Sequence, residues 1–550
     1  MKQKILDVML SHGMLIHPSA AEHILSQKDP MGYAESLIKK VKEPPTILTL
    51  ENLRELENSS ESASVTIGQV CSAAPNAVSD VVVSSETFKP RVEPRAEPRI
   101  EPERTPAITP ETAEPPTPPR PASIAPPELP TAPAPVTAAV KTKKPLAKEY
   151  DFNLTILKDI TGNSTINGTV RGFTEYFRDR FRVLGQILRN KRELANAIDI
   201  RAAKRSTGQV KMVGMVSEVR ITKNGNKMLI LEDEADSARV IISRENRLFG
   251  DTIVVDEVIG IQGNVGKSGL IIADSIVRPD ISGMRVPNRA KIDLSVAFIS
   301  DIHVGSKTFL PEQWDRFIKW LNRCEDGAEK IKYIVLAGDV VDGVGVYPGQ
   351  EAELLIADIH EQYLDFAQRL SGVPDYIKVV ILPGNHDAVR PAEPQPAFSD
   401  NVKKTLSTAN IQFAGNPCTF SIEGVNILAY HGKSMDDFIS HFPGFTYSSP
   451  LPAMKEMLKR RHIAPIYGDK TPIAPENIDY LVIDRIPDIF VTGHVHSVAT
   501  EVYRGIALIN ASTWQSQTSY QVMHNFNPIP AKVPIVNLMT GEWEIKNFMS

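Results

Sequence analysis

VVILPGNHDAVRP (Val379–Pro391) joins an apolar run to a cluster of polar side chains. Four consecutive aliphatic residues predict a buried strand. A proline and a glycine stop the strand, and the residues that follow are Asn385, His386 and Asp387. These three side chains can bind a metal ion or move a proton. Alone, the cluster could be a polar turn, so its meaning depends on how the other strands of the chain end.

Five apolar strands are predicted from Lys291 onward, and all five end in the same kind of residue. They lie in the stretches LSVAFIS, YIVLAG, KVVILPG, VNILAYHG and DIFVTGHVH. Helical stretches such as PEQWDRFIKWLNRC and AELLIADIHEQYLDFAQRL separate them. Alternating strands and helices predict a layered α/β domain. In such domains ligands collect where the strands end at their carboxyl edges, so one site built by all five ends is expected.

The side chains at the five ends offer oxygen or imidazole nitrogen and no thiolate. The candidate metal ligands are Asp301, His303, Asp339, Asn385, His431, His494 and His496. Such a mixed set suits Mn²⁺, Fe or Zn²⁺ better than Ca²⁺. One cation needs fewer ligands, whereas two cations about 3.5–4 Å apart, bridged by one carboxylate, would use the whole set. We therefore expect two divalent metal ions, with Mn²⁺ preferred and Fe or Zn²⁺ as alternatives.

The chain before this domain changes composition along its length. Residues 1–57 carry apolar side chains at helical spacing, which predicts a small helical N-terminal module. Residues 58–148 are rich in proline, with 17 of the chain's 42 prolines between Pro90 and Pro145. Such a segment has too little apolar surface to form a core, so we expect a disordered linker. A Pro-rich recognition ligand is the alternative.

Two further segments lie between the linker and the α/β domain. Residues 149–206 predict a strand and then a helix with a basic face formed by Arg178, Arg180, Arg182, Arg189, Lys191 and Arg192. This face is either solvated or a surface for DNA phosphates or an acidic partner. Residues 207–282 predict five short strands, two of them around an Asn-Gly turn, which suits an OB-like β-barrel. These strands lack the aromatic residues that stack single-stranded bases, so a structural role is an equal alternative.

Composition excludes several classes of protein. The net charge of -5 and the isoelectric point near 6.2 do not favour a strongly basic nucleic-acid-binding chain, although local basic patches remain compatible. The three scattered cysteines fit a reducing cytoplasm and argue against a zinc-cysteine site. The N-terminus is a poor signal peptide and no run of about 18 apolar residues exists, so we expect a cytoplasmic protein without a membrane partner.

The order of the motifs, DxH, GDxxD, GNHD, H and GHxH, resembles the calcineurin-like metallophosphoesterase superfamily over residues 291–515. The resemblance implies one metal held by Asp301, His303, Asp339 and His496, and a second held by Asp339, Asn385, His431 and His494. Asp339 would then bridge the two ions. The resemblance also implies that His386 contacts the phosphate and protonates the leaving oxygen, and that Asp387 orients His386. Asp342 would support a ligand rather than bind metal itself.

The wider architecture resembles the small-subunit family of the archaeal family D DNA polymerases, over most of residues 1–57 and 150–550. Three stretches are similar to that family: GDVVDGVGVYPGQEAEL from Gly338, YHGKSMDDFI from Tyr430 and LINASTWQSQT from Leu508. The related B subunits of eukaryotic replicative polymerases have lost the metal ligands, whereas all of them are present here. The implied fold is multidomain, with a layered α/β calcineurin-like phosphoesterase domain at 291–550, the OB-like β-barrel and the helical module.

This resemblance implies a two-metal 3′→5′ exonuclease that proofreads mispaired, single-stranded 3′ ends of DNA. A large catalytic polymerase subunit would be its obligate partner and would dock on residues 510–550 and on the barrel. The N-terminal module could bind another replication factor. Two other functions stay open: a stand-alone metal-dependent phosphodiesterase or repair nuclease, and a non-catalytic scaffold subunit. Metal content of the purified protein and its co-purification with a large chain would separate them.

Overall fold

The computed structural model describes residues 15–16, 18–27, 29–40, 47–48, 53, 144–166, 168–407, 410–523 and 525–550. The chain divides into two compact units, Met1–Thr137 and Ala138–Ser550. The predicted disordered linker lies outside the described residues up to position 143, as do the first 14 residues of the predicted helical module. The last part of the predicted linker range is ordered, because Leu146–Glu149 form a 3-10 helix.

The first unit combines two helices with a short parallel strand pair. Its elements are β1 (Leu15–Ile16), α2 (Pro18–Leu25), α3 (Pro30–Lys40) and β2 (Ile47–Leu48). A small core holds them together, and its buried members are Ala20, Ile24, Ala34, Leu37 and Leu53. The helices follow the predicted apolar spacing. The strand pair was not predicted, because two-residue strands carry no periodic signal.

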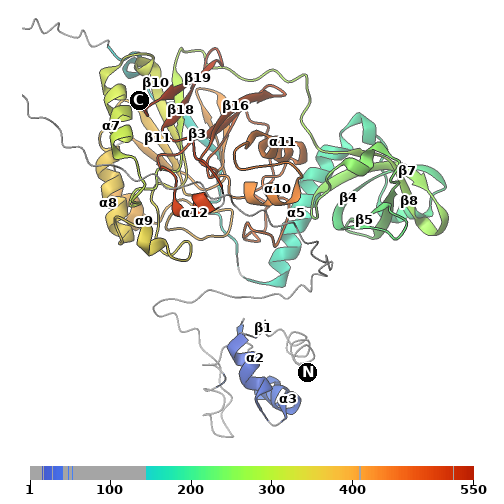
Figure 1. Ribbon diagram of the computed structural model, residues 1–550. Helices are drawn as coiled ribbons and strands as arrows, with labels where there is room; N and C mark the ends of the chain where they lie inside the picture. Colours follow the sequence, from blue (N-terminus) through green and yellow to red (C-terminus); the bar gives the residue numbers. More distant parts are fainter. Residues whose placement is uncertain are drawn as a thin grey trace, which may run out of the picture. The chain divides into compact units, whose positions relative to one another are not determined.

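Two mixed six-stranded sheets dominate the described part of the second unit (Figure 1). The first sheet contains β9 (Ser295–Ile299), β10 (Ile331–Ala337), β11 (Lys378–Leu382), β12 (Ile411–Phe413), β18 (Lys532–Asn537) and β19 (Trp543–Asn547), in the order β12-β11-β10-β9-β18-β19. The second contains β3 (Leu154–Lys158), β13 (Cys418–Ile422), β14 (Val425–Ala429), β15 (Ile489–Thr492), β16 (Val498–Tyr503) and β17 (Ile506–Ala511), in the order β16-β17-β15-β14-β13-β3. The five predicted strands are thus divided between two sheets, with β9, β10 and β11 in one and β14 and β15 in the other.

The two sheets share one apolar core. Val296 and Phe298 of the first sheet belong to the same buried cluster as Phe420 and Ile427 of the second. Every residue of β9 and β10 is buried. Strands that are covered on both faces read as continuous apolar runs, and this explains why these two were visible in the sequence.

Helices cover the outer face of each sheet (Figure 1). On the first sheet these are α7 (Pro311–Arg323) and α8 (Ile359–Leu370), and on the second α10 (Met435–His441) and α11 (Leu451–Arg460). The unit is therefore a mixed α/β fold, as predicted. The helix predicted over Ala352–Leu370 is shorter than expected. It begins at Ile359, because the Asp358 side chain accepts hydrogen bonds from the next turn and caps it there.

A closed five-stranded barrel precedes the α/β part. Its strands are β4 (Gly208–Ile221), β5 (Lys227–Glu232), β6 (Ser237–Ile242), β7 (Val258–Val265) and β8 (Ile271–Val277), in the order β4-β5-β6-β8-β7. All five strands were predicted, and the structure confirms a small closed barrel. The predicted turn between β4 and β5 is also present, with Gly225 at a φ of 76° that a residue with a side chain seldom adopts.

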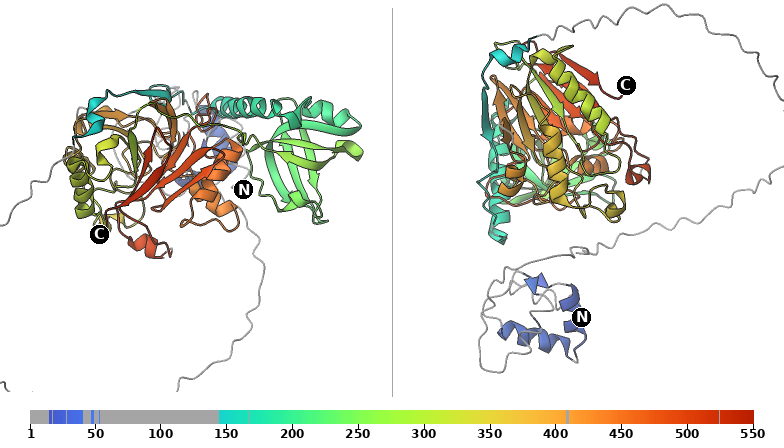
Figure 2. Two further views of the ribbon diagram at one scale, coloured as in Figure 1. Left: turned by 90° about the horizontal axis from the view of Figure 1, so that it is seen from above. Right: turned by 90° about the vertical axis from the view of Figure 1, so that its left-hand side faces the viewer.

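Helix α5 (Val170–Arg189) runs beside the barrel (Figure 2) and links it to the α/β part. Phe181 and Leu184 pack on Val213 of β4. Arg180 is fully buried, and its Nε donates to Asp479 Oδ2 at 2.8 Å. The predicted basic face is therefore wrong for Arg180, which is neither solvated nor open to DNA. Helical periodicity alone could not show that a carboxylate 299 residues away covers this position.

The described cysteines, Cys324 and Cys418, are buried free thiols. Cys71 lies outside the described residues. Within the ranges that the structure describes, no helix has both the length and the apolar content needed to cross a membrane.

The Arg180–Asp479 pair yields a test of stability. We expect Arg180→Met to lower the free energy of unfolding by about 3–5 kcal/mol, because the buried Asp479 carboxylate loses its guanidinium and keeps only His462 as a side-chain partner. Arg178→Met on the same helix is the matched control, since its ion pair with Glu175 is exposed on both sides and is worth about 0–1 kcal/mol. Denaturant titration measures both. Equal unfolding midpoints for the two variants would show that the buried pair does not hold helix α5.

Candidate metal centre

The five predicted strand ends meet at one cavity, although their strands belong to two sheets. The cavity has a volume of about 280 Å³, and the candidate ligands among its lining residues are His303, Asp339, Asn385, His494 and His496. The other two candidates, Asp301 and His431, are fully buried, and they lie 3.4 Å from His496 and 3.2 Å from Asp339, respectively. The structure therefore brings all seven candidate ligands together.

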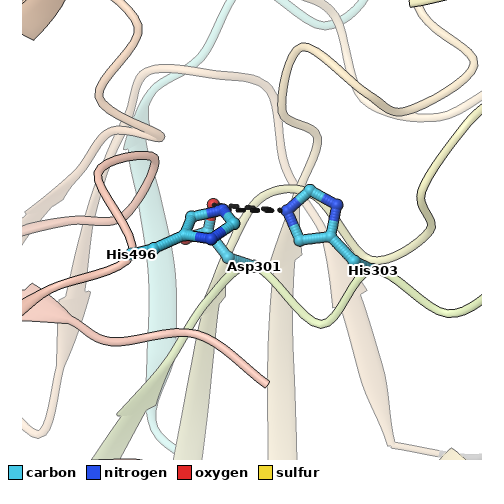
Figure 3. Close-up of side chains that lie close together, drawn as sticks. All are labelled: Asp301, His303 and His496. Atoms are coloured by element: carbon cyan, nitrogen blue, oxygen red, sulfur yellow. Dashed lines mark hydrogen bonds and ion pairs between the residues drawn. The ribbon is translucent and has the colours of Figure 1, made fainter. Parts of the chain in front are cut away.

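Asp301, His303 and His496 form the first group of potential ligands (Figure 3). The Nε2 atoms of the two imidazoles are 3.1 Å apart. Asp301 Oδ1 lies 3.8 Å from His303 Nε2 and 3.4 Å from His496 Nε2. Two imidazole nitrogens that carry lone pairs attract each other only when a proton or a cation lies between them. Their convergence with a carboxylate suits a metal ion.

Asp339 joins this group to a second one. Its Oδ2 lies 3.2 Å from His431 Nε2 and 3.8 Å from His303 Nε2. Asn385 Oδ1 is 3.0 Å from the same His431 nitrogen. Asp339 therefore lies between the two groups, where a bridging carboxylate would have to be.

His494 is held less closely to the other ligands. Its ring lies 5.2 Å from the His431 ring, measured between centroids. It belongs to none of the clusters of His, Cys, Asp and Glu found among the described residues within 4.8 Å of one another. Its Nε2 lies 3.3 Å from Asp436 Oδ1, so Nδ1 is the ring nitrogen left for a metal.

Neighbouring groups also fix the tautomers of two other histidines. His303 Nδ1 lies 3.0 Å from Asp342 Oδ1, and His431 Nδ1 lies 2.9 Å from the carbonyl of Ala337. Because each Nδ1–H donates to an oxygen, Nε2 is the ring nitrogen that would bind a metal once it has lost its proton. Metal-binding histidines use such partners to hold their rings and to raise their basicity. Asp342 supports His303, in keeping with the supporting role expected for it.

The backbone is strained at five of the candidate ligands. Their φ angles are positive: 53° at Asp301, 53° at His303, 54° at Asp339, 68° at His494 and 47° at His496. L-residues seldom adopt this region, and each instance costs on the order of 1–3 kcal/mol. Such strain gathers at functional sites, where the surrounding structure enforces it. Residue spacing does not reveal this strain, so it was not predicted.

Two glycines allow the loops to approach this closely. A Cβ atom at Gly384 would lie 2.1 Å from Asp339 Oδ1, and one at Gly338 would lie 2.5 Å from His431 Nδ1. Real Cβ contacts do not come this near. Any side chain at either position would therefore displace a candidate ligand.

Asp387 lies in a different place from the one expected. Its Oδ2 accepts hydrogen bonds from the backbone N–H groups of Gly384 and Val340, at 2.8 and 3.3 Å, and its Oδ1 accepts one from Tyr363. His386 is oriented instead by the carbonyl of Asp342, which lies 2.7 Å from His386 Nδ1. The expectation that Asp387 orients His386 is therefore wrong in this structure, because the Asp387 side chain turns back to hold its own loop.

Two residues that contact candidate ligands were assigned no role from the sequence. Asp436, in the first turn of α10, contacts His494, and its Oδ2 is 2.7 Å from Lys433 Nζ. Gln521 on α12 (Ser519–Met523) contacts His496 Nδ1 at 2.9 Å. The signal for Asp436 was a carboxylate one helical turn beyond a strand-end histidine. No comparable signal marked Gln521.

The buried carboxylates make the site strongly negative. Burial alone lowers the pKa of His303, but hydrogen bonds with Asp301 and Asp342 outweigh it and raise that pKa to about 10. Burial likewise lowers the pKa of His431, while the charge of Asp339 raises it to about 9. Burial raises the pKa of Asp301, yet His303 and His496 hold that pKa well below its usual range. Without a metal, protons on the two histidines supply the positive charge that the carboxylates require.

Metal binding should therefore depend on pH. Both histidines are protonated at pH 7 in the metal-free chain and must lose a proton to bind a metal. Since both pKa values lie above neutrality, the apparent Mn²⁺ affinity should rise with pH, by up to about 100-fold per unit between pH 6.5 and 8.5. Calorimetry in buffers of different ionisation enthalpy counts the protons released. His431→Gln should release one proton fewer, and an affinity independent of pH would contradict the assignment.

Asp436 offers a second test. We expect Asp436→Asn to weaken metal binding by about 10–100-fold, because the carboxylate that holds His494 is lost while the side-chain volume stays the same. Asp469→Asn is the matched control, since Asp469 pairs with the surface residue His441 and not with a candidate ligand. Equilibrium dialysis with Mn²⁺ measures both. Equal affinities in the two variants would remove Asp436 from the site.

Comparison with known proteins identifies the family of the chain. The family model for the B subunit of DNA polymerases alpha and epsilon matches residues 296–500. The DNA polymerase II small subunit of Methanocaldococcus jannaschii is 44% identical over 407 residues, which cover 72% of this chain and 68% of that protein. The DNA polymerase II small subunit of Thermoplasma acidophilum is 43% identical over 385 residues, 70% of this chain and 79% of that one.

A solved structure described as a novel archaeal phosphodiesterase covers 46% of this chain and 99% of its own, at 12% identity and a TM-score of 0.24. That likeness is too weak to carry an argument. The sequence relatives establish the family of this chain, because identity above 40% extends over more than two thirds of both chains in each comparison. The chain belongs to the family of archaeal DNA polymerase II small subunits, the small subunits of the family D polymerases.

Proposed function

We propose that this subunit is a two-metal 3′→5′ exonuclease that proofreads mispaired 3′ ends of DNA for its polymerase. One observation carries the proposal: seven oxygen and imidazole ligands from five strand ends converge on one cavity, with Asp339 between two groups. One metal would be held by Asp301, His303, Asp339 and His496, and the other by Asp339, Asn385, His431 and His494. Mn²⁺ is the preferred ion, with Fe or Zn²⁺ as alternatives.

When bound, such a metal pair stabilises charge on the phosphate and provides an activated water at neutral pH. Hydrolysis breaks the bond between phosphorus and the 3′ oxygen of the preceding nucleotide, and water forms the new bond to phosphorus. His386 would give that leaving oxygen its proton. The carbonyl of Asp342 holds His386 Nδ1, which leaves Nε2 for this transfer. Burial lowers the pKa of His386, and the protonated ring is therefore a strong proton donor.

The cavity favours a single strand over a duplex. Its volume of about 280 Å³ lies just below the range of small-ligand pockets, which is roughly 300–1,000 Å³. That size suits about one nucleotide and not a base pair. An enzyme that acts within such a pocket must take the terminal nucleotide out of the duplex, which costs least when the base is mispaired.

A large catalytic polymerase subunit is the proposed partner, docking on residues 510–550 and on the barrel. Exposed apolar side chains support the first of these surfaces: Val522, Met523, Trp543 and Ile545. The proposed domains are a helical module at 1–57, a linker at 58–148, a strand and helix at 149–206, an OB-like barrel at 207–282 and a calcineurin-like phosphoesterase domain at 291–550. The module would bind another replication factor.

Exonuclease assays on 3′-labelled and 5′-labelled single-stranded DNA with Mn²⁺ test the activity. We expect stepwise shortening from the 3′ end, with losses of at least about 100-fold in Asn385→Ala and His431→Ala, because each variant removes a ligand of the second metal. His360→Ala is the matched control, since this histidine is exposed on helix α8.

Removal of the metal with a chelator should abolish cleavage, and added Mn²⁺ should restore it. No metal-dependent cleavage by the purified chain, alone or with the large subunit, would overturn the proposal and favour a scaffold role.

A further inference from the structure

Four aromatic side chains line the cavity beside the candidate ligands: Tyr347, Tyr447, Tyr520 and Phe526. We call these four residues the aromatic rim. Tyr347 lies in the loop after β10, Tyr447 lies between α10 and α11, and Tyr520 lies on α12 with Phe526 just beyond it. Three separate segments thus deliver rings to one cavity, while the strand ends deliver the ligands.

The rings extend outward from the residue proposed to protonate the leaving oxygen. The Tyr347 ring lies 6.3 Å from the His386 ring and 6.0 Å from the Tyr520 ring, between centroids. Tyr447 and Phe526 form a second pair with centroids 6.0 Å apart. Tyr347 therefore lies next to His386, the residue proposed to contact the reacting phosphate. The base of a nucleotide bound at that phosphate would lie in this region.

Two rings of the rim are open to solvent, and the other two are packed. Tyr520 is 51% exposed and Tyr347 is half-buried, whereas Phe526 is 9% exposed and Tyr447 packs against the core cluster beneath α10 and α11. The loop that carries Tyr347 contains three glycines with positive φ, at Gly343, Gly345 and Gly349. A loop of this kind adds little to folding, so the exposure of its ring needs another reason.

The charged side chains of the cavity do not explain the exposed rings. The lining residues Asp339, Asp342 and Asp436 are acidic, and the lining cation Lys433 is paired with Asp436 at 2.7 Å. A polyanion such as DNA gains no affinity from these side chains themselves. Flat apolar faces are what the cavity offers beyond its metal ligands, and base stacking on aromatic rings is worth a large share of single-strand binding.

We propose that the aromatic rim is a subsite for unpaired bases at the 3′ end of single-stranded DNA, with Tyr347 and Tyr520 as the stacking residues. The inference rests on the proposed exonuclease function and adds how unpaired ends would be chosen. A base that is paired in a duplex cannot reach these rings, whereas a frayed or mispaired base can. Because any base can stack on an aromatic ring, the subsite would select unpaired bases without selecting a particular sequence.

Binding in place of cleavage tests the subsite. The protein is the full chain carrying His386→Ala, loaded with Mn²⁺. On the proposed mechanism this variant lacks the proton donor, so the DNA is not cleaved during the measurement. Fluorescence anisotropy compares two 5′-labelled single strands, one ending in thymidines and one whose last two residues are abasic. We expect the normal end to bind about tenfold more tightly. Adding Tyr347→Leu or Tyr520→Leu should reduce this preference to within about twofold, and Tyr347→Phe or Tyr520→Phe should preserve it.

A preference that survives in both Leu variants would overturn the subsite. Equal weakening on normal and abasic ends would also overturn it, because the rings would then support the loops and not a base. The cleavage assay is scored separately. Base-dependent binding without cleavage would overturn the exonuclease and keep the subsite, and cleavage without base-dependent binding would overturn the subsite alone.

Discussion

Three buried carboxylates at the meeting of two sheets set the main constraint on this subunit. Asp301, Asp339 and Asp342 are each at most 1% exposed. Burial of carboxylate charge is costly unless positive charge or hydrogen bonds compensate it. Histidines on neighbouring strand ends supply the compensation, either as protonated rings or as ligands to cations. The negative charge of the carboxylates must therefore be compensated in any state of the site. Whether protons or metal ions supply the positive charge decides what chemistry the site can perform.

The two-sheet architecture makes this balance possible. A single parallel edge would spread five ligand-bearing loops over the width of five strands, about 4.8 Å apart. In this chain three loops come from the first sheet and two from the second, and the shared apolar core holds the sheets together. Ligands far apart in sequence thus come within 4 Å of one another. The strained backbone at these loops is tolerated because the buried strands before them cannot shift.

Much of the arrangement was visible in the sequence. The buried strands read as apolar runs, and the ligand types at their ends were unusual enough to identify as a set. What escaped prediction depended on partners distant in sequence. From the sequence, Arg180 is predicted to lie on a basic face, but in the structure it is paired with Asp479. Asp387 is predicted to orient His386, but its side chain accepts a hydrogen bond from the backbone of its own loop. The division into two sheets was also hidden, because a strand's periodicity does not say which neighbour it pairs with.

On the proposed function, the chemistry lies at the strand ends and the choice of substrate lies on the surface loops. The candidate ligands follow directly from strands in the core, so small displacements there would disturb the charge balance and the strain together. Tyr347 and Tyr520, the two open rings of the rim, lie outside the apolar core, and loops of this kind vary in sequence more readily than core strands. Among the described residues, the apolar core between the two sheets contains no candidate metal ligand. Relatives could therefore lose the ligands and still keep the two-sheet fold.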